Sequence, residues 1–221
     1  MIDFQIKFFE KEKIKERFEE YILGIDIGGT NTNLCVAGVK NNRPVFLFSL
    51  NFETKKIDSI IPSIIETIKF SKEKYEINLK KACIGAPGVV TSDNKHAELT
   101  NIRWNVDSEE IIKKTNLESV YILNDFQVLG YGLNLLKDKD LTLIKKGKTP
   151  KNKTKAIIGP GTGLGKTILA YNKKNNLYIP LESEGGHADF PARNSFELEL
   201  IDFVKKFRKI EMPITCEELL S

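Results

Sequence analysis

The chain has 221 residues, which suits one large domain or two small ones, and its 41% hydrophobic content is ample for a packed core. Its net charge is only +4, and lysines alternate with acidic residues, so composition gives little support for a nucleic-acid-binding surface. No apolar run reaches membrane length, no signal peptide is recognisable, and the three cysteines lack disulfide or zinc spacing; we expect a cytoplasmic protein with no membrane partner.

The first part of the chain predicts a short extension followed by a three-stranded meander. Residues 1–20 are expected to form a helix, because Ile14 and Phe18 lie four apart on one face. From Tyr21, YILGIDIGGTN predicts a strand entering a glycine turn, and the strands LCVAGVK and VFLFSLNF follow around an Asn-Asn turn. Glycines allow close backbone approach, and successive N–H groups in a turn attract anions. This first turn is therefore a candidate phosphate site.

A helix, a strand and a long polar loop come next. The helix begins at Asp58 or Ser59, shows isoleucines at three-and-four spacing and accommodates Pro62 in its first turn. The strand KACIGA ends at a Pro-Gly turn, and the loop VVTSDNKHAELTNIRWN carries Asn101 and the single tryptophan, Trp104. Long loops inside compact domains are often functional.

A second helix is predicted after an N-cap at Asp107, and the buried strand SVYIL then ends at Asn124 and Asp125. In open α/β sheets, ligands bind at the carboxyl ends of strands, so these two polar residues are well placed for chemistry. The alternative is that they only cap the following helix, FQVLGYGLNLL. Capping and catalysis are compatible.

A charged connection over residues 136–155 leads to IIGPGTGLGKT, residues 157–167. This segment ends like a Walker A sequence, but Pro160 occupies a required glycine position, and the residues that follow predict strand, turn and strand rather than a helix. The arrangement of the first meander, a strand and a glycine turn followed by two further strands, therefore occurs twice in the sequence. Thr30 and Thr162 occupy equivalent positions in the two copies. Two such turns suggest a nucleotide held between two related lobes; two ordinary tight hairpins are the alternative.

The segment LESEGGHADF places Glu184 and His187 in a glycine turn, beside Glu182 and Asp189. Short donors and acceptors on a rigid turn suit a polyhydroxylated ligand such as a sugar. The other histidine, His96, has no such neighbours and is expected to be exposed.

Two helices are predicted at the end of the chain. One opens at Ser195, with these apolar residues expected to face inward: Leu200, Ile201, Phe203, Val204 and Phe207. The other follows a capping box from Thr215 to Glu218 and has only about one and a half turns, too few to sustain itself. Since the second copy of the arrangement also contains less chain than the first, we expect a fragment that lacks much of its second lobe.

The ordered motifs IDIGGTN, LTNIRW, LNDFQVLGYGL, GPGTGLG and EGGHADF resemble the bacterial-type glucokinases, members of the actin-like, hexokinase and Hsp70 superfamily. The resemblance covers about residues 21–221 and implies an α/β fold of the ribonuclease H-like actin and hexokinase ATPase type, with an incomplete second lobe. The expected organisation is an extension at 1–20, a small lobe at 21–135 and the start of a large lobe at 136–221.

The resemblance also implies ATP-dependent phosphorylation of glucose at its 6-hydroxyl, with Asp125 accepting the proton. Five other residues match sugar-binding positions: Asn101, Asn124, Glu184, His187 and Glu217. Asp26 is expected to reach Mg²⁺ through water, and no metal site made of protein ligands alone is implied. The matched residues around the phosphates are Gly28, Gly29, Thr30, Asn31, Gly161, Thr162 and Gly163. Whether the protein forms a homodimer is left open.

The sequence departs from the family pattern at several positions. Thr32 and Asn33 stand where alanine and arginine often follow GGTN, Lys166 replaces a small or apolar residue, and FPAR reorders the usual FAPR. The family's adenosine-binding segment lies beyond the position of Ser221. We therefore expect this chain alone to phosphorylate glucose poorly or not at all.

Three alternatives stay open from sequence. One is a sugar kinase or repressor of the repressor, open-reading-frame and kinase (ROK) family, although that family's cysteine-rich zinc loop is missing and only about 20 residues precede the first strand. Another is a glucose-binding fragment without catalytic activity. The third is an actin-like filament protein, which shares the phosphate turns but has no need of EGGH or TNxxW.

Overall fold

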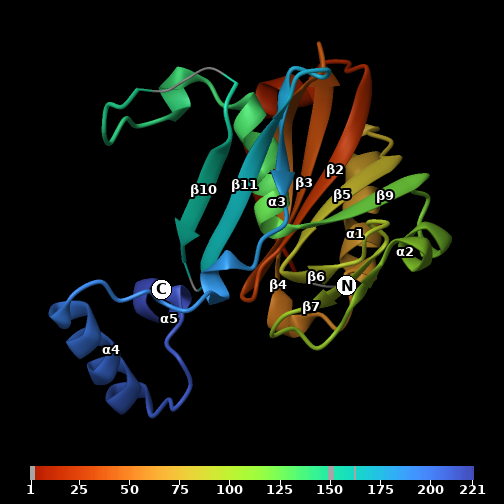
Figure 1. Cartoon of the computed structure of the whole chain (residues 1–221). Coiled ribbons are helices and arrows are strands. Elements are labelled where there is room, and N and C mark those ends of the chain that lie inside the picture. The colour runs from red at the N-terminus through yellow and green to blue at the C-terminus, as the bar shows by residue number, and fades with distance from the viewer. Residues whose placement is uncertain (1–2, 149–151, 162) are drawn as a thin grey trace. The chain divides into compact units, whose positions relative to one another are not determined.

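The computed structural model describes residues 3–148, 152–161 and 163–221 (Figure 1). The described residues form two compact units, divided between Val128 and Leu129. In the described residues, no helix is both long enough and apolar enough to cross a membrane.

The first unit is built on a six-stranded mixed sheet with the order β1-β4-β3-β2-β5-β9. Its antiparallel meander consists of β2 (Glu20–Ile27), β3 (Asn31–Lys40) and β4 (Arg43–Glu53), as the sequence predicts. The Asn41–Asn42 turn between β3 and β4 has φ angles of 53° and 55°, a left-handed conformation that asparagine tolerates. The strands β5 (Lys81–Ala86) and β9 (Ser119–Asn124) run parallel to β2, so the three share one carboxyl edge.

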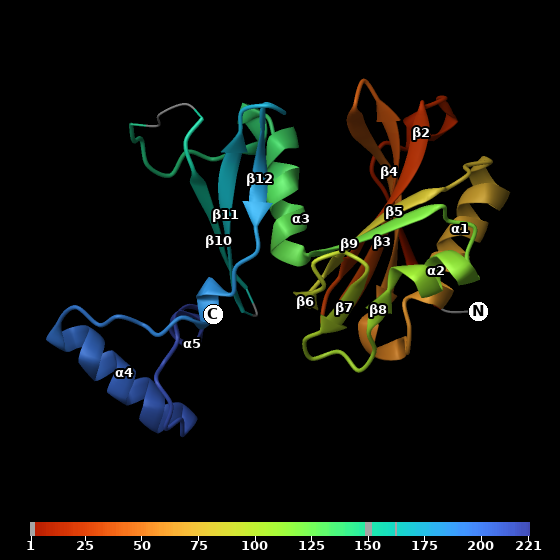
Figure 2. The same ribbon diagram turned by 45° about the vertical axis from the view of Figure 1, so that its right-hand side comes forward.

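The helix α1 (Ile61–Tyr75), labelled in Figure 2, follows the meander in the first unit. Its apolar side chains belong to the core of that unit. Pro62 lies in its first turn, as predicted, and the helix ends where Glu76 adopts a left-handed conformation with φ of 57°. Ile64 of α1 and Phe48 and Phe52 of β4 are fully buried in this core. The short 3-10 helix η2 (Thr54–Lys56) joins β4 to α1.

The prediction of a helix over residues 1–20 is wrong. The chain forms the strand β1 (Gln5–Phe8), which pairs antiparallel with the edge of β4, and the 3-10 helix η1 (Lys11–Lys15). The aromatic ring of Phe8 lies 6.3 Å from that of Phe48, so the strand gains both backbone pairing and an aromatic contact. Local helical spacing cannot anticipate such a long-range partner.

The prediction of a long polar loop after Pro87 is also wrong in part, because this segment contains a small antiparallel sheet. Its strands are β6 (Gly88–Val90), β7 (His96–Leu99) and β8 (Val106–Asp107). Ala97 and Val106 are fully buried and anchor this sheet to the core, while the polar residues face outward. The helix α2 (Ser108–Lys114) follows, and the Asp107 carboxylate accepts a hydrogen bond from the backbone N–H of Glu110.

The second unit contains the predicted second meander. Its strands are β10 (Lys155–Pro160), β11 (Leu164–Asn172) and β12 (Leu177–Leu181), all antiparallel. The helix α3 (Asp125–Gly132), which runs from the first unit into the second, lies along these strands (Figures 1 and 2). A side chain at Gly130 would approach Pro180 Cβ to 2.5 Å, so the glycine allows close helix–sheet packing. Two 3-10 helices follow α3: η3 (Leu133–Leu135) and η4 (Asp138–Asp140).

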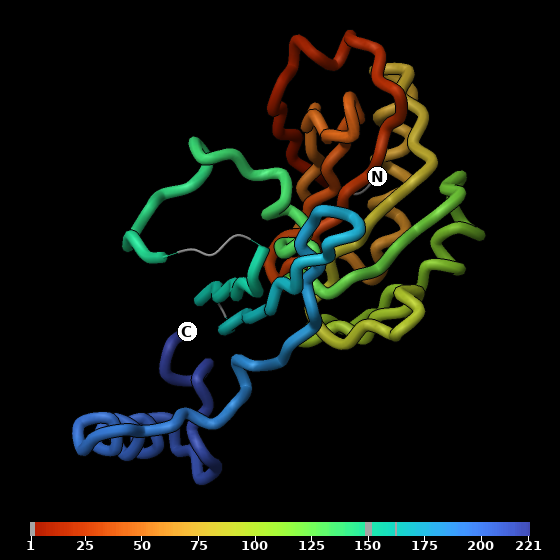
Figure 3. The backbone as a smooth tube through the Cα atoms, turned by 45° about the horizontal axis from the view of Figure 1, so that its top comes forward, coloured from red at the N-terminus to blue at the C-terminus, as the bar shows by residue number. Residues whose placement is uncertain are grey.

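The last elements are η5 (Gly185–His187), α4 (Ser195–Arg208) and α5 (Cys216–Leu220). The prediction that the apolar face of α4 packs inward is wrong for Phe203 and Phe207, which are 63% and 76% exposed, whereas Leu200, Ile201 and Val204 are half-buried. Figure 3 shows α4 standing away from the strands of its own unit. An amphipathic pattern specifies an apolar face but not the surface that covers it.

Candidate active site

The candidate site residues fall into two sets, one in each unit. The first set lies at the carboxyl edge shared by β2, β5 and β9. Strand register places Asp26 beside Gly85, and Ala86 beside Asn124. The parallel arrangement therefore brings Asp26 and the Asn124–Asp125 pair to the same edge of the sheet, where ligands bind in α/β folds.

The first glycine turn connects β2 to β3 at this edge. The N–H of Gly28 donates to the carbonyl of Asn31 at 3.0 Å, and a Cβ on Gly28 would lie only 2.8 Å from that carbonyl oxygen. Gly29 has open space where a side chain would be, and Thr30 and Asn31 are exposed. The turn is thus tight at its base and accessible at its tip.

Two buried threonines fix the base of this turn. Thr54 donates its N–H to the carbonyl of Thr30 at 2.9 Å and its hydroxyl to the carbonyl of Gly28 at 2.6 Å. Since a hydroxyl has a single proton, the 2.9 Å contact between Thr32 Oγ1 and Thr54 Oγ1 must have Thr32 as the donor. Sequence analysis missed the role of Thr54, because no local pattern links it to a turn more than 20 residues earlier.

Asn124 and Asp125 both contact the start of α3. Asn124 Oδ1 accepts from the N–H of Phe126 at 3.0 Å, and Asp125 Oδ1 accepts from the same group at 2.8 Å. The Asn124 amide also lies 3.4 Å from the carbonyl of Gly88. The capping role considered from sequence is therefore real, and it holds both side chains at the sheet edge where they remain half-buried.

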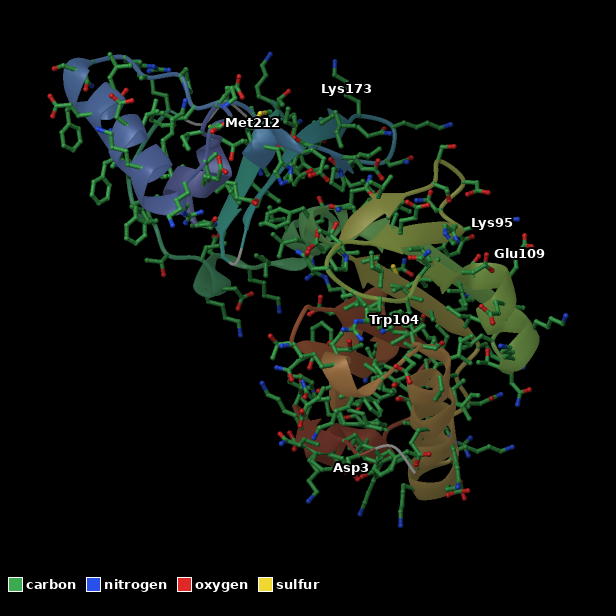
Figure 4. All side chains as sticks on the ribbon, turned by 90° about the horizontal axis from the view of Figure 1, so that it is seen from below. Asp3, Lys95, Trp104, Glu109, Lys173 and Met212 are labelled. Carbon is green, nitrogen blue, oxygen red and sulfur yellow. The ribbon has the colours of Figure 1, made fainter. Side chains whose placement is uncertain are left out.

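Asn101 lies in the turn that follows β7. The preceding residue, Thr100, donates its N–H to the carbonyl of Pro87 at 3.0 Å, which ties the turn to the end of β5. Asn101 is exposed and has a φ of 61°, a conformation that its short polar side chain favours. Trp104, labelled in Figure 4, packs against the core beneath this segment.

In the second unit, three segments distant in sequence converge. Gly161 donates its N–H to the carbonyl of Gly163 at 2.8 Å in the second glycine turn; Thr162 lies outside the described residues. The N–H of the next residue, Leu164, donates to Glu217 Oε2 at 2.8 Å. A Cβ on Gly163 would come within 2.7 Å of the same carboxylate oxygen, so glycine is needed for Glu217 to approach the turn.

The predicted sugar turn lies against this arrangement. His187 Nδ1 is 3.1 Å from Glu184 Oε2, and His187 Nε2 is 3.5 Å from Glu217 Oε1. Gly186 packs so tightly that an added Cβ would lie 2.1 Å from the carbonyl oxygen of Leu164. Glu184, His187 and Glu217 thus form a cluster of hydrogen-bonding side chains directly beside the second glycine turn.

The start of α5 holds Glu217 in place. Thr215 accepts from the N–H of Glu218 at 3.3 Å, and Glu218 accepts from the N–H of Thr215 at 2.7 Å, which confirms the predicted capping box. Cys216 donates its N–H to the carbonyl of Ala188 at 2.9 Å. The capping box and this link orient the Glu217 carboxylate, of which only 30% is exposed.

Cysteine thiols are not suited to nucleophilic chemistry in the first unit. Burial raises the pKa of the Cys35 thiol to about 11 and also raises the pKa of Cys83. Because the thiolate is the nucleophilic form, both residues are unreactive near neutral pH. Carboxylates, amides and an imidazole are the groups available for chemistry.

Comparison with known proteins gives a consistent result. The glucokinase family model matches residues 23–221. A glucokinase from Nostoc sp. is 33% identical over 201 residues, which cover 90% of this chain and 57% of the relative. The chain therefore spans a little over half the length of such relatives.

Two solved glucokinases share the fold. The enzyme of an Antarctic psychrotroph gives a TM-score of 0.72 at 24% identity, covering 91% of this chain and 61% of that one. The Balamuthia mandrillaris enzyme, solved in complex with glucose, gives 0.67 at 21% identity, covering 90% and 59%. With the family match over nearly the whole sequence, these findings place the fold among sugar kinases of the actin-like ATPase type. The chain belongs to the glucokinase family.

Proposed function

We propose that the protein transfers the γ-phosphoryl group of ATP to the 6-hydroxyl of glucose. The observation that carries this proposal is the contact between the second glycine turn and the cluster of Glu184, His187 and Glu217. One face of that cluster offers acceptors and an imidazole to sugar hydroxyls, while its other face is bonded to a turn suited to phosphate. A sugar kinase needs these two binding functions next to each other.

The chemistry assigns Asp125 as the base. Its carboxylate accepts the proton of the 6-hydroxyl as that oxygen forms a bond to the γ-phosphorus and the bond to the β-phosphate oxygen breaks. Asn124 and Asn101, which lie in the same unit as Asp125, are proposed to bind sugar hydroxyls. The two glycine turns are proposed to bind the phosphates through their backbone N–H groups.

The residues at the first turn fit a magnesium nucleotide. Mg²⁺ is commonly bound by one or two carboxylates together with substrate phosphates and water. Asp26 supplies an exposed carboxylate at the end of β2, next to the first turn. Asp26 would hold Mg²⁺ there, and the ion would supply positive charge against the phosphate oxygens. The three cysteines are free thiols, which supports the proposal of a cytoplasmic location.

Titration calorimetry with glucose tests the sugar site. We expect the chain to bind glucose, and Glu217→Gln to weaken binding by about tenfold, because a charge-assisted hydrogen bond is replaced by a neutral one. Glu211→Gln is the matched control, since Glu211 is exposed and lies outside the cluster. Absence of glucose binding, or equal affinities for the two variants, would contradict the proposal.

A single-turnover assay with ATP tests the catalytic role of Asp125. In a protein completed beyond Ser221, because this chain alone is expected to transfer poorly, we expect Asp125→Asn to retain glucose affinity and to lower transfer by about 10²–10⁴-fold, the range for loss of a general base. Glucose binding that is unaffected by ATP would instead support a glucose-binding module without chemistry.

A further inference from the structure

A polar cleft of about 820 Å³ opens beside the first glycine turn, within the first unit. One wall is the turn itself, with Thr30 and Asn31, and the other includes residues 3–7 of the N-terminal segment. Asp3, at the end of that wall, is labelled in Figure 4. The wall formed by β1 precedes the region matched by the family model, which begins at residue 23. The strand β1 thus contributes a wall of the cleft from outside the matched region.

The floor of the cleft is uncharged. Asn33 Oδ1 accepts from Asn51 Nδ2 at 2.6 Å, so the side chain that follows the turn is engaged with its neighbour on β4. Ser49 and Asn51 continue the polar lining along β4. Attraction of an anion by a charged side chain must therefore come from the lysines on the cleft walls.

Three lysines line the cleft, and the ammonium groups of two of them already interact with other side chains of the protein. Lys56 Nζ lies 2.8 Å from Glu53 Oε1, and that hydrogen bond, with a further contribution from the charge of Asp3, raises the pKa of Lys56. Lys7 Nζ lies over the ring of Phe9, 5.1 Å from its centroid. In the part of the chain that the structure describes, Lys55 has neither an ion pair nor a hydrogen bond from its side chain.

The position of Lys55 is fixed relative to the turn. The residue before it, Thr54, is bonded through its N–H and its hydroxyl to the carbonyls of Thr30 and Gly28. The backbone at the next position therefore cannot move away from the turn without breaking these buried bonds, which keeps the flexible side chain of Lys55 attached beside the cleft. Its ammonium group is exposed and unneutralised, while the two acidic residues of the cleft, Asp3 and Glu53, interact with Lys56.

We propose that Lys55 binds a phosphate group of the nucleotide held at the first glycine turn, in a cleft completed by β1. The proposal rests on the function proposed above. It identifies a positively charged side chain for the first glycine turn. The family often has an arginine at the position of Asn33, and the neutral asparagine of this chain does not supply that charge. An ammonium group binds phosphate as a point charge and needs no fixed geometry, which suits an exposed lysine on a short 3-10 helix.

Calorimetric titration with inorganic tripolyphosphate tests this assignment in the whole 221-residue chain. We expect Lys55→Gln to weaken binding by about tenfold and Lys55→Arg to restore it. Lys69→Gln is the matched control, because Lys69 is an exposed lysine of α1 outside the cleft. Amide NMR should show the signals of Gly29 and Thr30 shifting with tripolyphosphate in the unaltered chain.

The possible outcomes separate this inference from the proposed function. If the chain fails to bind tripolyphosphate, or if Lys55→Gln behaves like Lys69→Gln, the role of Lys55 is overturned even when glucose binds normally. If tripolyphosphate binding depends on Lys55 while glucose fails to bind, the anion site stands and the sugar kinase function falls.

Discussion

The hydroxyl of Thr54 offers the sharpest test of how the first glycine turn is held. Replacement by valine keeps the β-branched shape but removes the donor to the Gly28 carbonyl and the acceptor for Thr32. Both threonines are buried, so the groups left behind cannot regain full hydration. With roughly 1 kcal/mol net for each hydrogen bond and a further penalty for an unpaired buried group, we expect a loss of about 2–3 kcal/mol.

Urea unfolding followed by Trp104 fluorescence measures this effect in the first unit alone. Trp104 is the single tryptophan of the chain, and it packs against the core of that unit. Thr67→Val is the matched control, because the buried Thr67 hydroxyl donates only to the carbonyl of Ser63 within its own helix. We expect the control to lose about 1 kcal/mol.

A double-mutant cycle measures the interaction between the Thr32 and Thr54 hydroxyls separately from the other effects of each substitution. Thr32→Val in the Thr54→Val background removes the hydroxyl that was left unpaired. The double variant is therefore expected to lose about 1 kcal/mol less than the sum of the single variants. Additive losses, or a Thr54→Val cost equal to that of Thr67→Val, would refute the proposed bracing of the turn.

Two further predictions concern packing and pH. Gly186→Ala should lower glucose affinity by tenfold or more, because the added Cβ would lie 2.1 Å from the Leu164 carbonyl oxygen and overpacking costs about 1–3 kcal/mol. Gly132→Ala is the control and should leave glucose affinity unchanged, because its Cβ would meet no atom within 4 Å. The pKa of Cys35 is about 11 in the folded chain against 9.0 ordinarily, so between these values only the unfolded chain ionises this thiol. The contribution of the buried thiol to folding stability is therefore complete below pH 9 and is lost as the pH rises to 11. Unfolding measured at pH 8 and pH 10 should show Cys35→Ala to be less pH-sensitive than the unaltered chain by about 1 kcal/mol. Equal sensitivities would contradict the burial of this thiol.

The two meanders illustrate what sequence determines well. Their strands and turns depend on neighbouring residues: alternating apolar positions, glycines at the strand ends and asparagines that tolerate positive φ. The capping box at Thr215 and the first-turn position of Pro62 are equally local, and both were predicted correctly. The resemblance carried by the ordered motifs implies the α/β fold, and comparison with known glucokinases supports it.

The errors arose where the deciding contact is distant in sequence. Residues 5–8 form a strand because β4 offers an unpaired edge, and the paired residues on that edge are 40 or more positions away. The face of α4 shows the opposite case: its spacing is helical, as predicted, but its phenylalanines are exposed because no described segment covers them. Periodicity reports which face is apolar, whereas packing depends on the rest of the molecule.

The sequence by itself determined the local chemistry of this protein: two glycine turns after apolar strands, a polar pair at a strand end and a histidine among carboxylates. Only the tertiary structure decided which of these groups meet. Glu217 bonds the N–H of Leu164 from 53 positions along the chain, and Thr54 bonds Gly28 from 26 positions away. A turn can be specified by a few adjacent residues because its backbone angles are local, but convergence of such distant groups requires the whole core to form around them.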